Sequence, residues 1–339
     1  MAFSDLVRTA EDKINRAGVR RKAEAGWTPT VTGFFGYGTE GKAHILARVL
    51  MADPNEKKAE NPWAEAERGW RQFFTVQVGD YPVTVTCGSK TVSTHTDPGG
   101  YVDVVVYDHG LTPGTHEVLI AAGDSEPVAA TVLIVEPSAT HGIICDIDDT
   151  VMVTILPRAV LAAWNSWIRK TNTRQPVTGM AEFLHHIQDL HPGTPIVYLS
   201  TGAWNTYDTL TLFLEHHGFP TGPLLLTDWG PTPTGLFRNG KEHKRVEMRN
   251  LFLEFPEVNW YLVGDNGQHD PLIYGEAMNE FPERIAAVAI RELSPGEHLL
   301  SHGTMRTLAV PDLSYHREVP VYYGRDGREL LEQLDTPGS

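Results

Sequence analysis

The distribution of apolar residues along the chain changes near residue 140. Before that point, from Phe73 to Val135, short runs rich in β-branched residues follow one another, separated by turn-forming sequences such as DPGG and TPGT. After it, apolar runs of strand length such as GIICDI, PIVYLST and WYLVGD alternate with helical stretches such as MAEFLHHIQDL. The first pattern is typical of an all-β sandwich, and the second predicts a parallel sheet covered by helices on both faces.

Three parts are therefore predicted. Residues 1–27 form an amphipathic helix, residues 28–139 form a β-sandwich domain, and residues 140–339 form an α/β domain. The end of the chain, VPVYYGRDGRELLEQL, is expected to add a strand, a turn and a closing helix to the α/β domain.

The N-terminal helix is predicted over residues 3–25, where apolar residues recur at helical spacing. Its second half is basic. A basic amphipathic helix can lie on an anionic membrane surface, but the same pattern also suits a helix packed against its own protein. Both interpretations stay open, and a peripheral membrane contact is one of them. The apolar positions are Phe3, Leu6, Val7, Ala10, Ile14 and Ala17.

A glycine-rich stretch, GYGTEG, begins at Gly36 and matches the spacing of a dinucleotide-binding loop. A strand-like segment precedes it, but the sequence after it has no clear helical stripe or helix cap. A glycine-rich turn between two strands is therefore favoured over nucleotide binding.

Composition narrows the class of protein. The 339 residues carry a formal charge of −15, which argues against a general nucleic-acid binder. The two cysteines make no disulfide framework, and no secretory-type leader or 18-residue apolar run is found. We expect a cytoplasmic protein, with peripheral membrane contact if the N-terminal helix binds lipid.

Acidic residues cluster at the end of the apolar run GIIC. Asp146, Asp148 and Asp149 precede Thr150, and three carboxylates so close together repel one another and lose hydration. Such a cluster needs a cation or a chemical role, although Asp149 and Thr150 also suit a helix cap. A calcium loop of the EF-hand type does not fit, because Val151 and Pro157 stand where that loop needs Gly and Glu.

Three further motifs follow in order: Ser200 after IVYL, Lys244, and GDNGQHD at residues 264–270. Together with DIDDT, this order and spacing resemble the haloacid dehalogenase-like phosphohydrolase superfamily. The residues of these motifs are similar to those of the App1-type phosphatidate phosphatases, which are related to lipins. The resemblance covers most of residues 140–292 and implies a Rossmann-like parallel sheet of haloacid dehalogenase type.

The resemblance implies a role for each motif residue. Asp146 attacks phosphorus to form an aspartyl-phosphate, and Asp148 protonates the leaving oxygen and later activates water. Ser200 and Lys244 stabilise the transferring phosphoryl group. Mg²⁺ is the expected cofactor, with Asp146, Asp148 (through its backbone carbonyl) and Asp265 as ligands. Supporting residues around this site are expected to be Asp270, Thr150, Asn205 and Gln268, while Trp204 and His269 are candidates to line it.

The gaps between motifs predict a minimal cap. About thirty residues separate Thr150 from the helix near Met180, and the segment 225–241 is also short, so a large lid does not fit. An open site suits a phosphate displayed on a lipid, and the predicted reaction is hydrolysis of phosphatidate to diacylglycerol. The alternatives are a phosphatase for a protein, sugar or nucleotide phosphate, and a non-catalytic lipid-binding scaffold. A membrane-facing lip is expected from Trp164, Trp167, Arg158, Arg169 and Lys170, unless the tryptophans pack onto the sheet.

Overall fold

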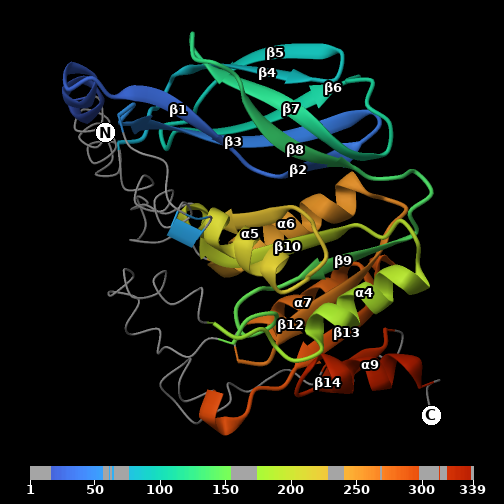
Figure 1. The fold of residues 1–339 in the computed structure, drawn as a ribbon. Helices are drawn as coiled ribbons and strands as arrows, with labels where there is room; N and C mark the ends of the chain where they lie inside the picture. Colours follow the sequence, from blue (N-terminus) through green and yellow to red (C-terminus); the bar gives the residue numbers. More distant parts are fainter. Residues whose placement is uncertain are drawn as a thin grey trace, which may run out of the picture. The chain divides into compact units, whose positions relative to one another are not determined.

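The computed structural model describes residues 17–55, 61, 63–64, 76–153, 174–227, 240–267, 269–297, 313 and 319–336. These residues group into two compact units, one made mainly of residues up to Pro137 and the other mainly of residues from Ser138 onward (Figure 1). No helix among the described residues is long and apolar enough to cross a membrane.

The first unit contains eight strands that hydrogen-bond into one sheet. Their order is β1-β3-β2-β8-β7-β4-β5, with β6 paired to β3, and every neighbouring pair is antiparallel except β2 with β8. The predicted all-β content is present, but the arrangement as a sandwich of two separate sheets is not confirmed. The strands are β1 (Thr28–Gly33), β2 (Gly36–Thr39), β3 (Lys42–Ala52), β4 (Pro82–Cys87), β5 (Lys90–His95), β6 (Tyr101–Tyr107), β7 (Gly114–Ala122) and β8 (Val128–Ile134).

The core of this unit follows from the two-residue period of its strands. In β4, for example, Val83, Val85 and Cys87 are buried, while the residues between them are more exposed. Buried aliphatic side chains from β1, β3, β6, β7 and β8 complete the same core. The alternation of apolar and polar residues therefore determines which face of each strand is covered.

The GYGTEG stretch is a hairpin, as predicted. β2 pairs with β3 through Thr39 and Lys42, and the turn between them consists of Glu40 and Gly41. A Cβ on Gly38 would lie 2.2 Å from the Lys42 carbonyl oxygen, so the close strand pairing requires glycine there. Because a strand follows where a dinucleotide-binding unit has a helix, the nucleotide interpretation is wrong.

Only part of the predicted N-terminal helix lies within the described residues. Residues 17–24 are helical, and Arg20 pairs with Glu24 one turn later. Residues 3–16 of the predicted helix lie outside the described part of the chain, so membrane contact through this helix stays a prediction.

The second unit contains a six-stranded sheet in which every described neighbouring pair is parallel. Its order is β11-β10-β9-β12-β13-β14, so β9, which carries the acidic motif at its end, lies between β10 and β12. The predicted strands and the closing strand and helix are confirmed. The elements are β9 (His141–Cys145), α4 (Met180–Leu190), β10 (Ile196–Ala203), η3 (Trp204–Thr206), α5 (Tyr207–His216), β11 (Leu224–Thr227), α6 (Gly240–Glu254), β12 (Asn259–Asp265), α7 (Asp270–Glu280), η4 (Pro282–Arg284), β13 (Ile285–Arg291), β14 (Val321–Gly324) and α9 (Gly327–Asp335).

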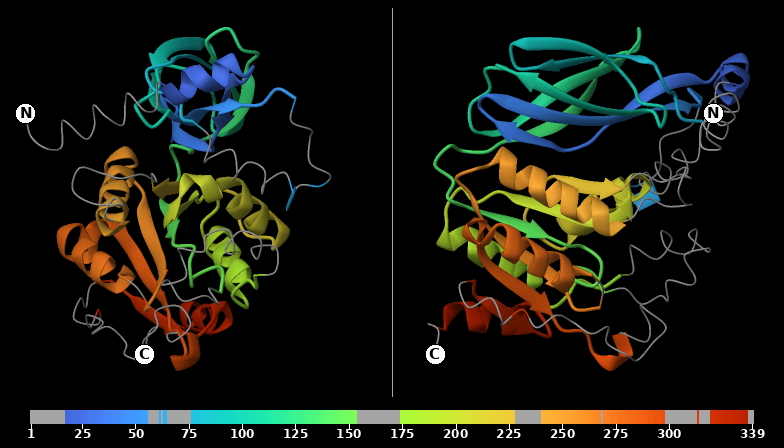
Figure 2. Two further views of the ribbon diagram at one scale, coloured as in Figure 1. Left: turned by 90° about the vertical axis from the view of Figure 1, so that its left-hand side faces the viewer. Right: turned by 180° about the vertical axis from the view of Figure 1, so that it is seen from behind.

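Helices cover both faces of this sheet, as the alternating pattern predicts. In the left view of Figure 2, the orange helices α6 and α7 lie on one side of the strands, and α4, α5 and α9 lie on the other. This explains why the strands are apolar along their whole length: Ile143, Ile144 and Cys145 in β9 are each at most 1% exposed. Because both faces of β9 are covered, the first polar residue after its apolar run, Asp146, lies at the carboxyl edge of the sheet.

Candidate active site

Neighbouring parallel strands bring the acidic motifs to one edge of the sheet. Asp146 follows β9 directly, and Asp265 is the last residue of the adjacent strand β12. Ser200 lies near the end of β10, on the other side of β9. Two helices add the remaining groups, since Lys244 lies near the start of α6 and Asp270 is the first residue of α7. The carboxyl edge of a parallel sheet is where such folds bind ligands.

A buried lysine joins two of these carboxylates. The Lys244 Nζ atom lies 2.7 Å from Asp146 Oδ1 and 2.6 Å from Asp270 Oδ1. All three side chains are almost fully buried. Burial alone lowers the pKa of Lys244, but attraction and hydrogen bonds from Asp146 and Asp270 raise its pKa overall, so the ammonium stays charged.

One lysine does not neutralise the cluster. The pKa of Asp146 is raised to about 8, because burial together with the charges of the nearby Asp270 and Asp148 outweighs the attraction of Lys244. The pKa of Asp265 is also raised, first by burial and then by Asp270 and Asp146. Three buried carboxylates therefore share one buried cation. More positive charge is needed to keep all of them ionised.

The cluster fits a divalent metal ion. Ligand oxygens of Asp146, Asp265 and Asp270 lie within 4.8 Å of one another, and all three residues are buried. Asp265 Oδ1 accepts a hydrogen bond from the Gly267 backbone, whereas Oδ2 has no partner among the described residues. A buried, unpartnered carboxylate oxygen is costly unless a cation binds it, and carboxylates are ligands that Mg²⁺ prefers.

Asp148 differs from the buried carboxylates in its surroundings. Its side chain is partly exposed, and its Oδ2 atom accepts a long hydrogen bond, 3.4 Å, from Ser200 Oγ. The Ser200 hydroxyl also accepts a hydrogen bond of 2.9 Å from the Gly202 backbone. Asp148 and the buried Ser200 are thus neighbours. The group of possible metal-binding side chains contains Asp270 in place of Asp148.

The predicted supporting residues have different surroundings. Thr150 Oγ1 lies 3.4 Å from Asp146 Oδ2, which places it against the predicted nucleophile. Asn205 is buried, and its Oδ1 atom has no hydrogen-bond partner among the described residues. Trp204 is buried and His269 half-buried. Gln268 lies outside the described residues, so its role stays a prediction.

The predicted membrane-facing lip also lies outside the described residues, which include neither 154–173 nor 228–239. The chain on each side of the first segment is well defined. Val153 donates to the Gln175 carbonyl oxygen at 3.0 Å, and Val177 donates to the Val151 carbonyl oxygen at 2.9 Å. The residues that flank 154–173 are therefore hydrogen-bonded to one another a few residues from Asp148.

Sequence reasoning missed two buried arginines beside the acidic loop. Arg174 is 5% exposed; burial lowers its pKa, while Asp148 and Asp149 counteract that shift. Arg291 is also 5% exposed, and its Nη1 atom donates to the Asp149 carbonyl oxygen at 2.8 Å. No motif marks Arg174. Arg291, however, ends the apolar run IAAVAI, so its place at the carboxyl edge of the sheet was a usable signal.

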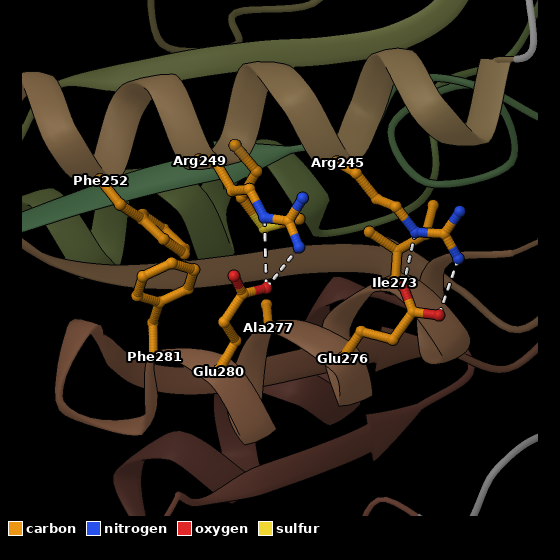
Figure 3. A pocket seen from close by; sticks show the side chains of 9 residues that line it. Arg245, Arg249, Phe252, Ile273, Glu276, Ala277, Glu280 and Phe281 are labelled. Carbon is orange, nitrogen blue, oxygen red and sulfur yellow. Dashed lines mark hydrogen bonds and ion pairs between the residues drawn. The ribbon is translucent and has the colours of Figure 1, made fainter.

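Ion pairs on the protein surface connect α6 to α7. Figure 3 shows Arg245 and Arg249 of α6 reaching across to Glu276 and Glu280 of α7, above a groove lined by apolar side chains that include Phe252 and Phe281. Arg245 binds Glu276 through two hydrogen bonds, of 2.5 and 2.7 Å. These contacts lie along the two helices that carry Lys244 and Asp270. Exposed ion pairs of this kind contribute little to stability.

Known proteins match the part of the chain that carries this site. Residues 141–292 match the family model described as the catalytic domain of phosphatidate phosphatase APP1. Phosphatidate phosphatase APP1 of Saccharomyces cerevisiae is 25% identical over 162 residues, which are 44% of this chain and 25% of that protein. An uncharacterized protein of Schizosaccharomyces pombe is 24% identical over 173 residues, 50% of this chain and 28% of that protein. The chain thus spans about a quarter of the length of these curated relatives.

A solved structure was also compared. The HAD domain of the effector protein Lem4 from Legionella pneumophila is 17% identical, covers 48% of this chain and 90% of that domain, and has a TM-score of 0.32.

The α/β unit therefore contains the part of the chain that resembles a phosphatase catalytic domain. Its residues 141–292 are similar to the catalytic domain of phosphatidate phosphatase APP1, which confirms the resemblance predicted from the sequence motifs.

Proposed function

We propose that the chain is a Mg²⁺-dependent phosphatase of haloacid dehalogenase type that hydrolyses phosphatidate to diacylglycerol through an aspartyl-phosphate on Asp146. The observation that carries the proposal is the buried cluster in which Lys244 faces the carboxylates of Asp146 and Asp270, with Asp265 beside them. A phosphate monoester dianion repels an anionic nucleophile, so the reaction needs concentrated positive charge at the attacking group. This cluster holds a lysine and carboxylates that suit a metal.

The surroundings of each side chain support one role in the proposed reaction. Asp146 attacks phosphorus, and Lys244 at 2.7 Å offsets the charge on the attacking oxygen and on the phosphoryl group. Asp148, which is partly exposed, protonates the leaving oxygen and then takes a proton from the attacking water. Ser200 donates to a phosphoryl oxygen from its place beside Asp148. Asp270 holds the Lys244 ammonium in place.

Mg²⁺ would be held by the carboxylates of Asp146 and Asp265, together with the backbone carbonyl of Asp148, and Asp270 is close enough to take part. When bound, it would neutralise the charge of the carboxylates and of the phosphoryl oxygens. Asp265 has a free carboxylate oxygen for this purpose among the described residues.

Phosphatidate is the substrate that the similarity to phosphatidate phosphatase APP1 favours. The short insertions near Asp148 leave no room for a large lid, and an open site can reach a phosphate at a bilayer surface. A cytoplasmic location with membrane contact through residues 3–25 belongs to the same proposal. The competing functions are hydrolysis of a protein, sugar or nucleotide phosphate, and lipid binding without catalysis.

Phosphate release measured with matched variants would test this. Wild-type protein, Asp146→Asn and the exposed control Asp189→Asn are given phosphatidate in mixed micelles or soluble phosphate esters, with Mg²⁺ or EDTA. We expect Mg²⁺-dependent release from phosphatidate by the wild type and by the control, and none by Asp146→Asn. Full activity of Asp146→Asn, or no release from any ester, would overturn the enzyme proposal. Sugar phosphates turned over far faster than phosphatidate would overturn only the substrate.

Liposome flotation tests the membrane contact separately. Full-length protein and a variant lacking residues 1–25 are compared on vesicles containing phosphatidate. Weaker binding after the deletion supports membrane contact through the helix, whereas unchanged binding assigns the helix a structural role.

A further inference from the structure

Arg291 connects the two acidic loops of the site. It is the last residue of β13 and pairs in register with Asp265, the last residue of β12. Its carbonyl oxygen accepts a hydrogen bond of 3.0 Å from the Asn266 backbone, directly after Asp265. Its side chain contacts the loop that follows β9, the strand on the far side of β12, where it donates to the Asp149 carbonyl oxygen.

The guanidinium group of Arg291 has three partners. Nη1 donates to the Asp149 carbonyl oxygen at 2.8 Å, and Nε donates to the Arg325 carbonyl oxygen at 3.2 Å. Nη2 forms an ion pair with Glu297. Because Glu297 neutralises the guanidinium, Arg291 adds little net charge to the site. Its contribution to the acidic loop is therefore geometric.

The loop that Arg291 holds has an unfavourable backbone conformation. Asp149 has a φ of 60°, in the left-handed region that residues with a Cβ rarely adopt. Asp149 is 1% exposed, and its backbone N–H donates to the Met152 carbonyl oxygen at 2.9 Å. The hydrogen bond from Arg291 fixes the other side of the same residue, so it determines the orientation of the peptide group after Asp149.

Asp149 lies between two residues of the reaction site. Asp148 precedes it and places its carboxylate beside Ser200, and Thr150 follows it and contacts Asp146. A rotation of the peptide groups around Asp149 would therefore turn the Asp148 side chain away from Ser200. Strained conformations of this kind persist only when several contacts hold them.

We propose that Arg291 is a positioning residue, whose hydrogen bond to the Asp149 carbonyl oxygen aims the Asp148 carboxyl group at the leaving oxygen of the substrate. This rests on the proposed function, in which Asp148 transfers the proton. It extends that function by assigning a role to a residue that touches neither substrate nor metal.

The inference is tested with leaving groups of different basicity. The leaving alkoxide of phosphatidate needs a proton from Asp148, whereas the nitrophenolate of p-nitrophenyl phosphate leaves with little help. The variant is Arg291→Lys, which keeps the charge but has no planar fork to reach three acceptors. Arg291→Gln is made in parallel. The variant whose unfolding is as cooperative as that of the wild type is the one whose activity is compared. The control is Glu297→Gln, which removes the partner charge and leaves the Asp149 contact.

For the Arg291 variant, we expect kcat/KM to fall roughly 10- to 100-fold on phosphatidate and less than about 3-fold on p-nitrophenyl phosphate, since proton transfer contributes about 100- to 10,000-fold. Glu297→Gln should stay within about 3-fold on both substrates. A general loss of folded enzyme would lower the apparent kcat/KM on both substrates equally. Equal losses, or no loss on phosphatidate, would overturn the inference.

A second measurement does not depend on turnover. Amide hydrogen exchange in peptides covering residues 146–153 should be faster in the Arg291 variant than in the wild type, and unchanged in Glu297→Gln. Unchanged exchange in the Arg291 variant overturns the inference. The two proposals fail differently: a wild type that releases phosphate from neither ester overturns the phosphatase function, while the exchange rates still show whether Arg291 holds the loop.

Discussion

The ammonium group of Lys244 lies 2.7 Å from a carboxylate oxygen of Asp146, and both side chains are almost fully buried in the α/β unit. Lys244 also lies 2.6 Å from Asp270, so one buried cation serves two buried anions. Breaking a buried pair by removing one partner leaves the other charge without compensation. Lys244 is therefore expected to matter for stability as well as for catalysis.

Replacing Lys244 by Met tests this expectation. In EDTA, we expect the free energy of unfolding to fall by about 3–5 kcal/mol, the loss typical of a broken buried ion pair. Urea denaturation measures it. The control Arg249→Gln removes a half-exposed ion pair from the same helix and should cost less than about 1 kcal/mol. Equal losses in the two variants would contradict the idea that burial makes the Lys244 contacts important.

Asp265→Asn should separate stability from metal binding. The Asn Oδ1 atom can still accept the hydrogen bond from Gly267, while one unpartnered buried carboxylate oxygen is removed. We expect a higher melting temperature than the wild type in EDTA and little further increase with Mg²⁺. The wild type should gain about 2.7 kcal/mol at a Mg²⁺ concentration 100 times its Kd. Thermal unfolding with and without Mg²⁺ measures both, and a full Mg²⁺ response in the variant would contradict the metal assignment.

The sequence was most informative about the elements of the α/β unit. Apolar runs such as GIIC and IVYL are covered on both faces and contain few polar residues, so their strands could be recognised locally. The order of strands could not, because β9 lies between β10 and β12 through contacts between residues far apart in the chain. In the first unit, hydrophobic alternation identified strands but did not determine how many sheets they form.

The site was predictable as far as its motifs extend. Asp146, Asp265 and Lys244 lie together because two strand ends and the start of α6 meet at one edge of the sheet. The motifs placed Asp270 around the site as a supporting residue, but its position among the possible metal-binding carboxylates depends on where α7 starts. The motifs did not include Arg291, which is 142 positions from Asp149 and has no characteristic spacing to it.

A pair of stacked histidines at the other end of β9 should make the protein sensitive to acid. The rings of His141 and His191 lie 3.6 Å apart, and His191 also contacts the Tyr261 hydroxyl at 3.1 Å. Burial lowers the pKa of both histidines, and the proximity of His191 lowers that of His141 further. The unfolded chain therefore binds protons more readily than the folded protein. The stability from the neutral rings is present above about pH 6.5 and is lost as the pH falls through the lower folded pKa values.

Melting temperatures measured between pH 7.5 and pH 5 test this. His191→Gln should show a smaller decrease over that range than the wild type, because fewer protons are taken up on unfolding. The exposed His95 offers a matched control, and His95→Gln should keep the wild-type decrease. An identical decrease in His191→Gln and the wild type would show that the stacked pair does not cause the acid sensitivity.

Gly264, the residue before Asp265 in β12, is predicted to be important for stability, because its lack of a side chain leaves room for Asp270 and Tyr274. A Cβ there would lie 2.6 Å from Asp270 Oδ2 and 2.8 Å from the Tyr274 hydroxyl, both of which are buried. Neither group can move freely, since Tyr274 donates to the Val263 carbonyl oxygen at 3.0 Å and Asp270 holds Lys244.

Gly264→Ala should therefore displace Asp270 and, through it, the lysine that faces Asp146. We expect a loss of about 1–3 kcal/mol in the free energy of unfolding, as for other overpacked cores. The matched control is Gly296→Ala, whose Cβ would have only Ser294 Oγ nearby, at 3.9 Å, and whose stability should change by less than about 0.5 kcal/mol. Urea denaturation and phosphate release, compared at equal folded fractions, distinguish a local from a general effect. Wild-type stability and turnover in Gly264→Ala would mean that the Asp270–Lys244 contact tolerates displacement, because the methyl group cannot fit without moving Asp270 or Tyr274.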